Sequence, residues 1–441
     1  MELKLRDKEF WIKKLKENDE NKWQDNERLY LYQFVTSILD TIIRHKNDMV
    51  CINEFGNVNL LDTFKKSEPL GSSGNLYSDN YKLTMQLDDY DINIAVKVVP
   101  IDHKERLHMY DTRFPVWREL KSLEMVTNLV KQRVIPNLPI LYGHYICNNC
   151  SYQNPQIINK EYKMCVLLLN ELADTDLRSW IIKYSNESVL SDERNSIWTN
   201  IFFQIWVVLY AVQSHYQMVH HDLHWGNLLI NYIKSGGYWI YIIEGVKYYV
   251  PNMGIMLKLW DFGKCFSVTN FRYHAEEIEF QNYSSVHKHD ISFGADISKI
   301  HNINRWIKDI SEITNKGVMP AHIDKMIQKI RQKGDNTPNL LLKKYMRPYM
   351  HNLIGSVCNS DGTDFKSITD VIIGELVAYN NKYALITKID IFNVILLIDI
   401  SNDSDEESVL FSKIKKIEQP IQDTTGNFEY LKEKCHGTYK I

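Results

Sequence analysis

The stretch HHDLHWGN at residues 220–227 decides the fold, and it directly follows an apolar run, IFFQIWVVLYAVQSHYQMV, at 201–219. The apolar run predicts a buried helix, and LLI at 228–230 predicts a short strand. Asp222 and Asn227 are therefore expected on a loop between the two. On such a loop an Asp carboxylate can accept a proton from an attacking hydroxyl, and an Asn oxygen can bind a divalent cation.

A second short motif, DFG at 261–263, ends the alternating segment IMLKLW at 255–260, which predicts a strand. Asp261 is suited to bind a second face of the same cation. Gly263 is expected to let the chain turn sharply after it. Each motif alone has a simpler explanation, but the ordered set predicts one site.

Upstream, the strand INIAVKVV at 92–99 carries Lys97 among apolar and β-branched residues. An unpaired ammonium is costly to bury, so Lys97 requires an anionic partner. Glu119, in the helical segment VWRELKSLEMVTNLV, is the preferred partner, with Glu124 as the alternative. The stretch PLGSSGNLY at 69–77 has glycines that allow a close approach to phosphate, although by itself it is more typical of an ordinary turn.

Taken in order, these motifs resemble the parts of the eukaryotic-like Ser/Thr protein kinase family: a Gly-rich loop, a strand lysine, a helix glutamate, a catalytic loop and DFG. The resemblance covers roughly residues 60–355. It implies ATP and Mg²⁺ as cofactors and a protein as substrate. The implied catalytic residues are Asp222, Lys97, Glu119 and His224; the implied ATP-binding residues are Gly71, Gly74, Lys97, Glu171 and Leu172; the implied magnesium ligands are Asn227 and Asp261.

Each part of the resemblance implies a role. Asp222 acts as the catalytic base, while Lys97 holds the α- and β-phosphates and is itself held by the helix glutamate. Gly71 and Gly74 match the second and third glycines of the loop, with Pro69 in place of the first.

The segment MCVLLLNELADTDLRSWI at 164–181 resembles the fifth strand and the hinge. The backbone of Glu171 and Leu172 is therefore the expected contact for adenine. Further along, Asp296 is the expected buried helix-capping aspartate of the C-lobe, with Asp290 as the alternative.

Two histidines depart from the kinase pattern. His221 stands where the family has the arginine that clamps a phosphorylated activation loop, which puts activation by loop phosphorylation in doubt. His224 replaces the usual lysine, and a protonated histidine can supply that charge in part. DLHWGN and the strand-rich insert before DFG resemble haspin-type kinases of the sort encoded by giant DNA viruses, although haspins lack a standard DFG.

The pattern as a whole predicts an α+β protein with a bilobal, protein-kinase-like fold. Residues 1–60 predict an N-terminal helical extension, 61–170 a β-rich N-lobe and 171–365 a helical C-lobe. Residues 366–441 contain short alternating strands, which predict a small SH3-like, β-barrel-like module. Whether that module binds peptide, RNA or its own kinase domain stays open.

The composition is typical of a folded, intracellular protein. A net charge of −3 gives no overall reason to bind nucleic acid or an acidic membrane. The charged N-terminus does not resemble a secretory signal, and no apolar run is expected to span a bilayer. The expected location is a host cytoplasm, or a virion if the chain is viral. Seven irregularly spaced cysteines do not form a disulfide framework and suit a reducing compartment. Cys147 and Cys150 are expected to be two thiols on a plain loop, while metal binding by this pair stays open because a zinc site would need two further ligands.

Two other functions stay open from the sequence. One is a small-molecule kinase, since DLHxGN also resembles choline and aminoglycoside kinases. The other is a catalytically inactive scaffold with a kinase fold, although Lys97, Asp222, Asn227 and Asp261 are all present. The sequence does not predict the substrate consensus, the activation mechanism or the oligomeric state.

Overall fold

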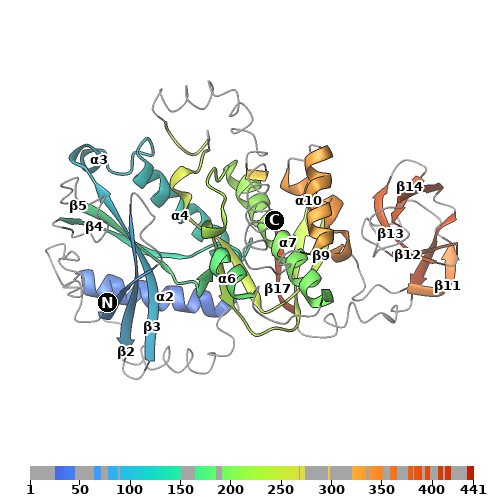
Figure 1. The fold of residues 1–441 in the computed structure, drawn as a ribbon, viewed down its shortest axis with the longest axis horizontal. Helices are drawn as coiled ribbons and strands as arrows, with labels where there is room; N and C mark the ends of the chain where they lie inside the picture. Colours follow the sequence, from blue (N-terminus) through green and yellow to red (C-terminus); the bar gives the residue numbers. More distant parts are fainter. Residues whose placement is uncertain are drawn as a thin grey trace. The chain divides into compact units, whose positions relative to one another are not determined.

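The chain divides into two compact units in the computed structural model. Figure 1 shows the helices and strands, coloured along the sequence. Unit 1 comprises Met1–Asn186, Val212–Lys234 and Met256–Trp306, and unit 2 comprises Glu187–Ala211, Ser235–Ile255 and Ile307–Ile441. The structure describes residues 25–44, 64–70, 78–87, 90–148, 150, 164–184, 191–267, 269–273, 296–297, 320–333, 337–350, 358–364, 376–380, 382–389, 393–397, 406–410, 413–418 and 435–441.

A five-stranded antiparallel sheet, ordered β1-β2-β3-β5-β4, forms the N-terminal part of unit 1. Lys97 lies in the middle strand of this sheet, opposite Asn80 on one side and Leu168 on the other. Along β3 the buried residues Ile92, Ile94, Val96 and Val98 alternate with more exposed ones, as in a strand with one face on the core. The strands are β1 (Phe64–Pro69), β2 (Asp79–Leu87), β3 (Tyr90–Ile101), β4 (Leu141–Asn148) and β5 (Met164–Glu171).

Two helices pack against the outer strand of this sheet. Helix α4 (Pro115–Lys131) begins with a proline, which is tolerated in the first turn because the N–H there has no helical partner. Helix α2 (Asp25–Arg44) contacts β4, and its Tyr32 ring lies 6.4 Å from that of Tyr142. The helix predicted for the N-terminal extension is therefore present over residues 25–44. A short helix, α3 (His103–Leu107), precedes α4.

The rest of unit 1 contains the segment HHDLHWGN at 220–227. Strands β6 (Thr175–Asp176), β7 (Leu228–Tyr232) and β10 (Ile255–Leu259) form a small sheet in the order β10-β7-β6. Two short 3₁₀ helices, η2 (Trp225–Asn227) and η3 (Phe262–Lys264), adjoin β7 and β10. Helix α6 (Leu177–Tyr184) follows β6.

Helix α7 (Ser191–Tyr216) is the long apolar helix predicted before HHDLHWGN. By length and composition alone, the segment Arg194–Tyr216 of this helix is long and apolar enough to cross a membrane, although no such segment was expected from the sequence. However, 78% of its most apolar window is buried inside the protein. Such burial is typical of the core helix of a folded domain.

Unit 2 contains the insert between the two motifs. Strands β8 (Tyr238–Ile243) and β9 (Val246–Pro251) form a hairpin whose two turn residues, Glu244 and Gly245, both have positive φ. Strand β17 (Cys435–Lys440), at the end of the sequence, pairs in parallel with β8. The other elements of this part are α10 (Ala321–Lys333), α11 (Pro338–Tyr345) and η4 (Arg347–Tyr349).

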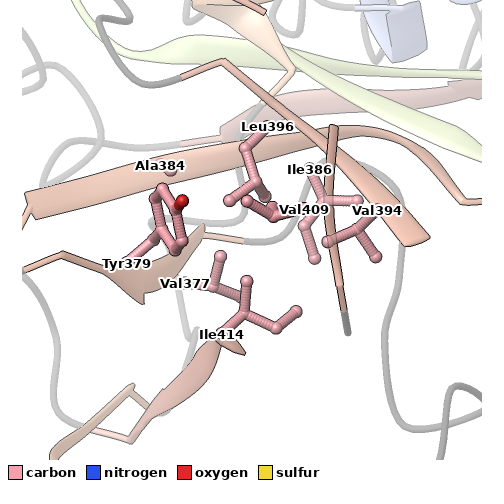
Figure 2. Close-up of a cluster of buried hydrophobic side chains, with 8 residues drawn as sticks. All are labelled: Val377, Tyr379, Ala384, Ile386, Val394, Leu396, Val409 and Ile414. Carbon is pink, nitrogen blue, oxygen red and sulfur yellow. The ribbon is translucent and has the colours of Figure 1, made fainter. Parts of the chain in front are cut away.

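Six strands near the C-terminus form a second antiparallel sheet, ordered β11-β16-β12-β13-β14-β15. Figure 2 shows its buried core, which consists of Val377, Tyr379, Ala384, Ile386, Val394, Leu396, Val409 and Ile414. Among the described strands no pairing joins β11 to β15, so the expected barrel-like closure is not found. The strands are β11 (Cys358–Asp364), β12 (Leu376–Tyr379), β13 (Lys382–Ile389), β14 (Asn393–Leu397), β15 (Glu406–Leu410) and β16 (Lys415–Glu418).

Two features were not expected from the sequence. A disulfide joins Cys150 to Cys165, so the prediction of a free thiol at Cys150 was wrong, whereas Cys147 is buried and takes no part in this disulfide. The parallel pairing of β17 with β8 of the insert hairpin was also not predicted. The predicted domain boundaries stay a prediction, but the mixed α+β fold is confirmed.

Candidate active site

Lys97 is the centre of a buried charge cluster. Its Nζ lies 2.6 Å from Glu119 Oε1 and 2.9 Å from Asp261 Oδ1. The ion pair predicted between Lys97 and Glu119 is therefore present, and the same ammonium also reaches the DFG aspartate. Glu124, the alternative partner, instead forms a surface pair with Lys121.

The two carboxylates keep Lys97 charged although it is only 6% exposed. Burial lowers the pKa of Lys97, but the charges of Glu119 and Asp261 outweigh it, and the net shift is upward. Burial raises the pKa of Asp261, but the Lys97 ammonium more than offsets this and lowers it to about 2. Asp261 is thus ionised at neutral pH, as a ligand for a divalent cation must be.

The backbone of the DFG segment differs from the prediction. Asp261 itself adopts the left-handed conformation, with φ 64° and ψ 77°, whereas Gly263 does not have a positive φ. Aspartate is one of the few residue types that tolerate this conformation. A Cβ built on Gly263 would lie 3.5 Å from Glu119 Oε2, an ordinary contact distance. The turn therefore depends on Asp261, and the expectation placed on Gly263 was wrong.

The loop 220–227 is tied to the DFG segment through His220. The ring accepts the Asp222 N–H at Nδ1, 3.3 Å away, and its Nε2 donates to the Trp260 carbonyl oxygen at 2.8 Å. Burial lowers the pKa of His220, consistent with a neutral ring that uses one nitrogen as acceptor and the other as donor. The Trp260 N–H in turn donates to the Asn227 carbonyl at 2.8 Å.

Asp296 accepts hydrogen bonds from the main chain at the start of this loop. Its side chain is fully buried, and its two carboxylate oxygens accept the main-chain N–H groups of His220 and His221 at 2.8 Å and 2.9 Å. The buried position expected for Asp296 is therefore confirmed. Asp290, the alternative, lies outside the described residues.

Asp222, which is partly exposed, and Asn227, which is buried, lie next to each other on this loop. The Asn227 amide nitrogen donates to the Asp222 main-chain oxygen at 2.9 Å, and it lies 3.5 Å from Oδ2 of the same residue. Since that nitrogen is engaged, the Asn227 oxygen is the atom that can serve as a metal ligand. Lys264, directly after DFG, lies with its Nζ 3.0 Å from Asp222 Oδ1.

His221, one of the two histidines that depart from the kinase pattern, packs against aromatic residues. His221 has a positive φ of 63°, and its ring stacks on Phe266 at 5.9 Å. Phe266 stacks on Tyr273 at 4.5 Å, and the Arg118 guanidinium of α4 lies 5.0 Å from the Tyr273 ring. A stack of aromatic rings therefore links loop 220–227 to the segment after DFG. It begins at His221, the position at which the kinase pattern has an arginine.

The hinge residue Glu171 makes a contact that the sequence did not reveal. Arg28 of α2 donates to both of its carboxylate oxygens, at 2.9 Å and 2.8 Å, and Lys258 of β10 lies 2.9 Å from Oε1. Burial raises the pKa of Glu171, but the two cations outweigh it and lower the pKa to about 2. Arg28 also donates to the carbonyl oxygens of Pro136 and Leu138.

The adenine contacts predicted for Glu171 and Leu172 stay a prediction. The Glu171 N–H donates to the Ile140 oxygen at 2.9 Å, and the Leu172 oxygen accepts from Asn231 at 3.3 Å. Gly71 and Gly74 lie outside the described residues. Their predicted phosphate contacts therefore also stay a prediction.

Comparison with family models shows the family of the chain. The model described as the haspin-like kinase domain matches residues 11–293, which include both motifs and the strand lysine. This chain belongs to the haspin-like kinase family. The match contains every predicted site residue, from Gly71 and Gly74 to Asp261.

Two curated relatives of this haspin-like kinase are viral proteins. "Uncharacterized protein R403" of Acanthamoeba polyphaga mimivirus is 25% identical over 342 residues, covering 58% of this chain and 44% of its own length. "Probable serine/threonine-protein kinase 380R" of Invertebrate iridescent virus 6 is 28% identical over 206 residues, covering 45% of this chain and 35% of its own. The matched part is thus less than half the length of these relatives.

Proposed function

We propose that this haspin-like kinase is an ATP- and Mg²⁺-dependent protein kinase that phosphorylates Ser or Thr residues of an intracellular protein. The observation that carries the proposal is the pairing of Lys97 Nζ with both Glu119 and Asp261, next to a catalytic loop that contains Asp222 and Asn227. Membership of the family and the name of the iridescent virus relative, a probable serine/threonine-protein kinase, support a protein substrate and Ser/Thr specificity.

The reaction requires one base and one in-line displacement. The hydroxyl oxygen of the acceptor forms a bond to the γ-phosphorus of ATP, and its proton passes to the Asp222 carboxylate. The bond between the γ-phosphorus and the β–γ bridging oxygen breaks, and its electron pair stays on ADP. Because the transition state is loose and highly charged, positioning and electrostatics supply most of the catalysis.

The donor set fits a magnesium ion bound together with ATP phosphates. Asn227 and Asp261 offer an amide oxygen and an ionised carboxylate, which are the hard oxygen ligands that Mg²⁺ prefers. Within the described part of the chain, no three His, Cys, Asp or Glu side chains gather as a metal site, so phosphates and water would complete the coordination. When bound, the ion would neutralise charge on the phosphates.

Lys97 is suited to the phosphates for the same electrostatic reason. Its two carboxylate partners fix the ammonium in one place, so little reorganisation is needed when an anionic ligand binds. In a pocket away from bulk water such a fixed charge acts more strongly than an exposed one.

Thermal unfolding with and without ATP and Mg²⁺ tests nucleotide binding. At about 100 times the dissociation constant, ligand binding stabilises a protein by roughly 2.7 kcal/mol, so a clear rise in Tm is expected for the wild type. Lys97→Met should lose most of this rise, because the phosphates lose their fixed cation. Lys121→Met, which removes a solvent-exposed lysine of α4, should keep it. A wild-type Tm that does not respond to ATP and Mg²⁺ would contradict the proposal.

A further inference from the structure

The Asp222 carboxylate lies between two basic side chains. Lys264 Nζ is 3.0 Å from Oδ1, whereas His224 Nε2 is 4.0 Å from Oδ2. The first distance is that of a hydrogen-bonded ion pair, and the second is too long for a hydrogen bond. The residue after DFG therefore makes the closer contact with the proposed base, although the resemblance drew attention to His224.

His224 is engaged elsewhere. It caps η2, and its Nδ1 accepts the Gly226 N–H at 3.1 Å. A Cβ built on Gly226 would lie 3.1 Å from that same nitrogen, so the ring lies tightly against the glycine. With Nδ1 used in this way, Nε2 is the ring nitrogen that faces Asp222, at 4.0 Å from Oδ2.

The backbone on both sides of Lys264 is held firmly. Phe262 is fully buried, and its ring contacts that of His220 at 5.3 Å. Cys265 is 1% exposed, and its sulfur lies 2.8 Å from the Ser122 hydroxyl of α4. The Lys264 side chain, in contrast, is 69% exposed, so its ion pair is expected to contribute little to stability.

We propose that Lys264 is a positioning residue of the phosphotransfer site. It binds Asp222 through Oδ1, orients Oδ2 towards the acceptor hydroxyl, and places its ammonium group beside the proposed base. The acceptor proton passes to Asp222 Oδ2, while Lys264 keeps its own protons. This inference rests on the proposed function, because it assigns a role within the same reaction.

Steady-state kinetics of Lys264 variants test the inference. Lys264→Ala is expected to lower kcat by roughly 10- to 100-fold, since misplacing a catalytic group by about 1 Å can cost about 100-fold. KM for ATP should change less than about threefold, because Lys97 and the metal ligands are untouched. Lys264→Arg, which keeps the charge, should stay within about threefold of the wild-type kcat. Lys121→Ala, an exposed lysine that pairs only across a surface turn of α4, is the matched control.

Two results would overturn the inference in an active enzyme: a kcat for Lys264→Ala within about twofold of the wild type, or a Lys264→Arg variant as impaired as Lys264→Ala. Equal Tm values for the wild type and all variants are expected, which separates this role from a structural one. A wild-type protein that transfers no phosphate would refute the proposed function and this inference together. The two failures are therefore distinguishable.

Discussion

Asp222→Asn is expected to lower kcat by roughly two to four decades, because an amide cannot take up the proton of the acceptor hydroxyl. The substitution keeps the size of the side chain. It also keeps the loop, since Asn227 donates to the main-chain oxygen of residue 222 and His220 accepts its N–H. The measurement is kcat at saturating ATP, together with the Tm rise caused by ATP and Mg²⁺, which should remain.

The matched control for this prediction is Asp91→Asn, which changes an exposed aspartate of β3. It should leave kcat close to that of the wild type. If Asp222→Asn turned over as fast as the control, Asp222 would not be the base, and the role assigned to this loop would have to be abandoned.

Arg28→Met is expected to destabilise the protein by roughly 3–5 kcal/mol, because removing one partner of a buried ion pair leaves the other charge poorly compensated. Arg28 is 2% exposed and makes four hydrogen bonds to Glu171, Pro136 and Leu138. The variant would leave two main-chain oxygens and part of a carboxylate without these donors. The free energy of unfolding by urea measures the loss.

Two further variants separate charge from packing in this cluster. Arg331→Met, on an exposed face of α10, should change stability by less than about 0.5 kcal/mol. A triple apolar replacement of Arg28, Glu171 and Lys258 should recover a large part of the loss, since a whole buried ionic cluster can be replaced at little cost. If the free energy of unfolding of Arg28→Met were within about 1 kcal/mol of the wild-type value, the claim that the buried Arg28–Glu171 pair stabilises the fold would be contradicted.

The predicted features that the structure contains, the Lys97–Glu119 ion pair and the long helix before HHDLHWGN, have local signals in the sequence. Lys97 was recognised because a lysine in an apolar strand needs an anion. The following helical segment offered two acidic candidates, Glu119 and Glu124, of which Glu119 was preferred. The long helix before HHDLHWGN was recognised from its apolar run. These contacts required no knowledge of the tertiary fold beyond the order of the motifs.

The features that were missed depend on long-range contacts or on backbone conformation. Arg28 and Glu171 are 143 residues apart, and nothing in the sequence around Arg28 marks it as buried. Strand β17 pairs with β8 across an even longer separation. The positive φ of Asp261 and the contact between Lys264 and Asp222 leave no periodic signal. For Lys264 the only hint was the missing lysine at position 224.

The most direct test of the central claim is transfer of labelled γ-phosphate from ATP to protein acceptors such as casein and histone, with choline and an aminoglycoside assayed in parallel. We expect the wild type, with Mg²⁺, to label Ser or Thr of a protein acceptor and to release one ADP for each phosphate transferred. The Asp222→Asn variant is expected to label the same acceptor far more slowly. Equal labelling by the wild type and Asp222→Asn, or labelling of the small molecules without any of protein, would contradict it.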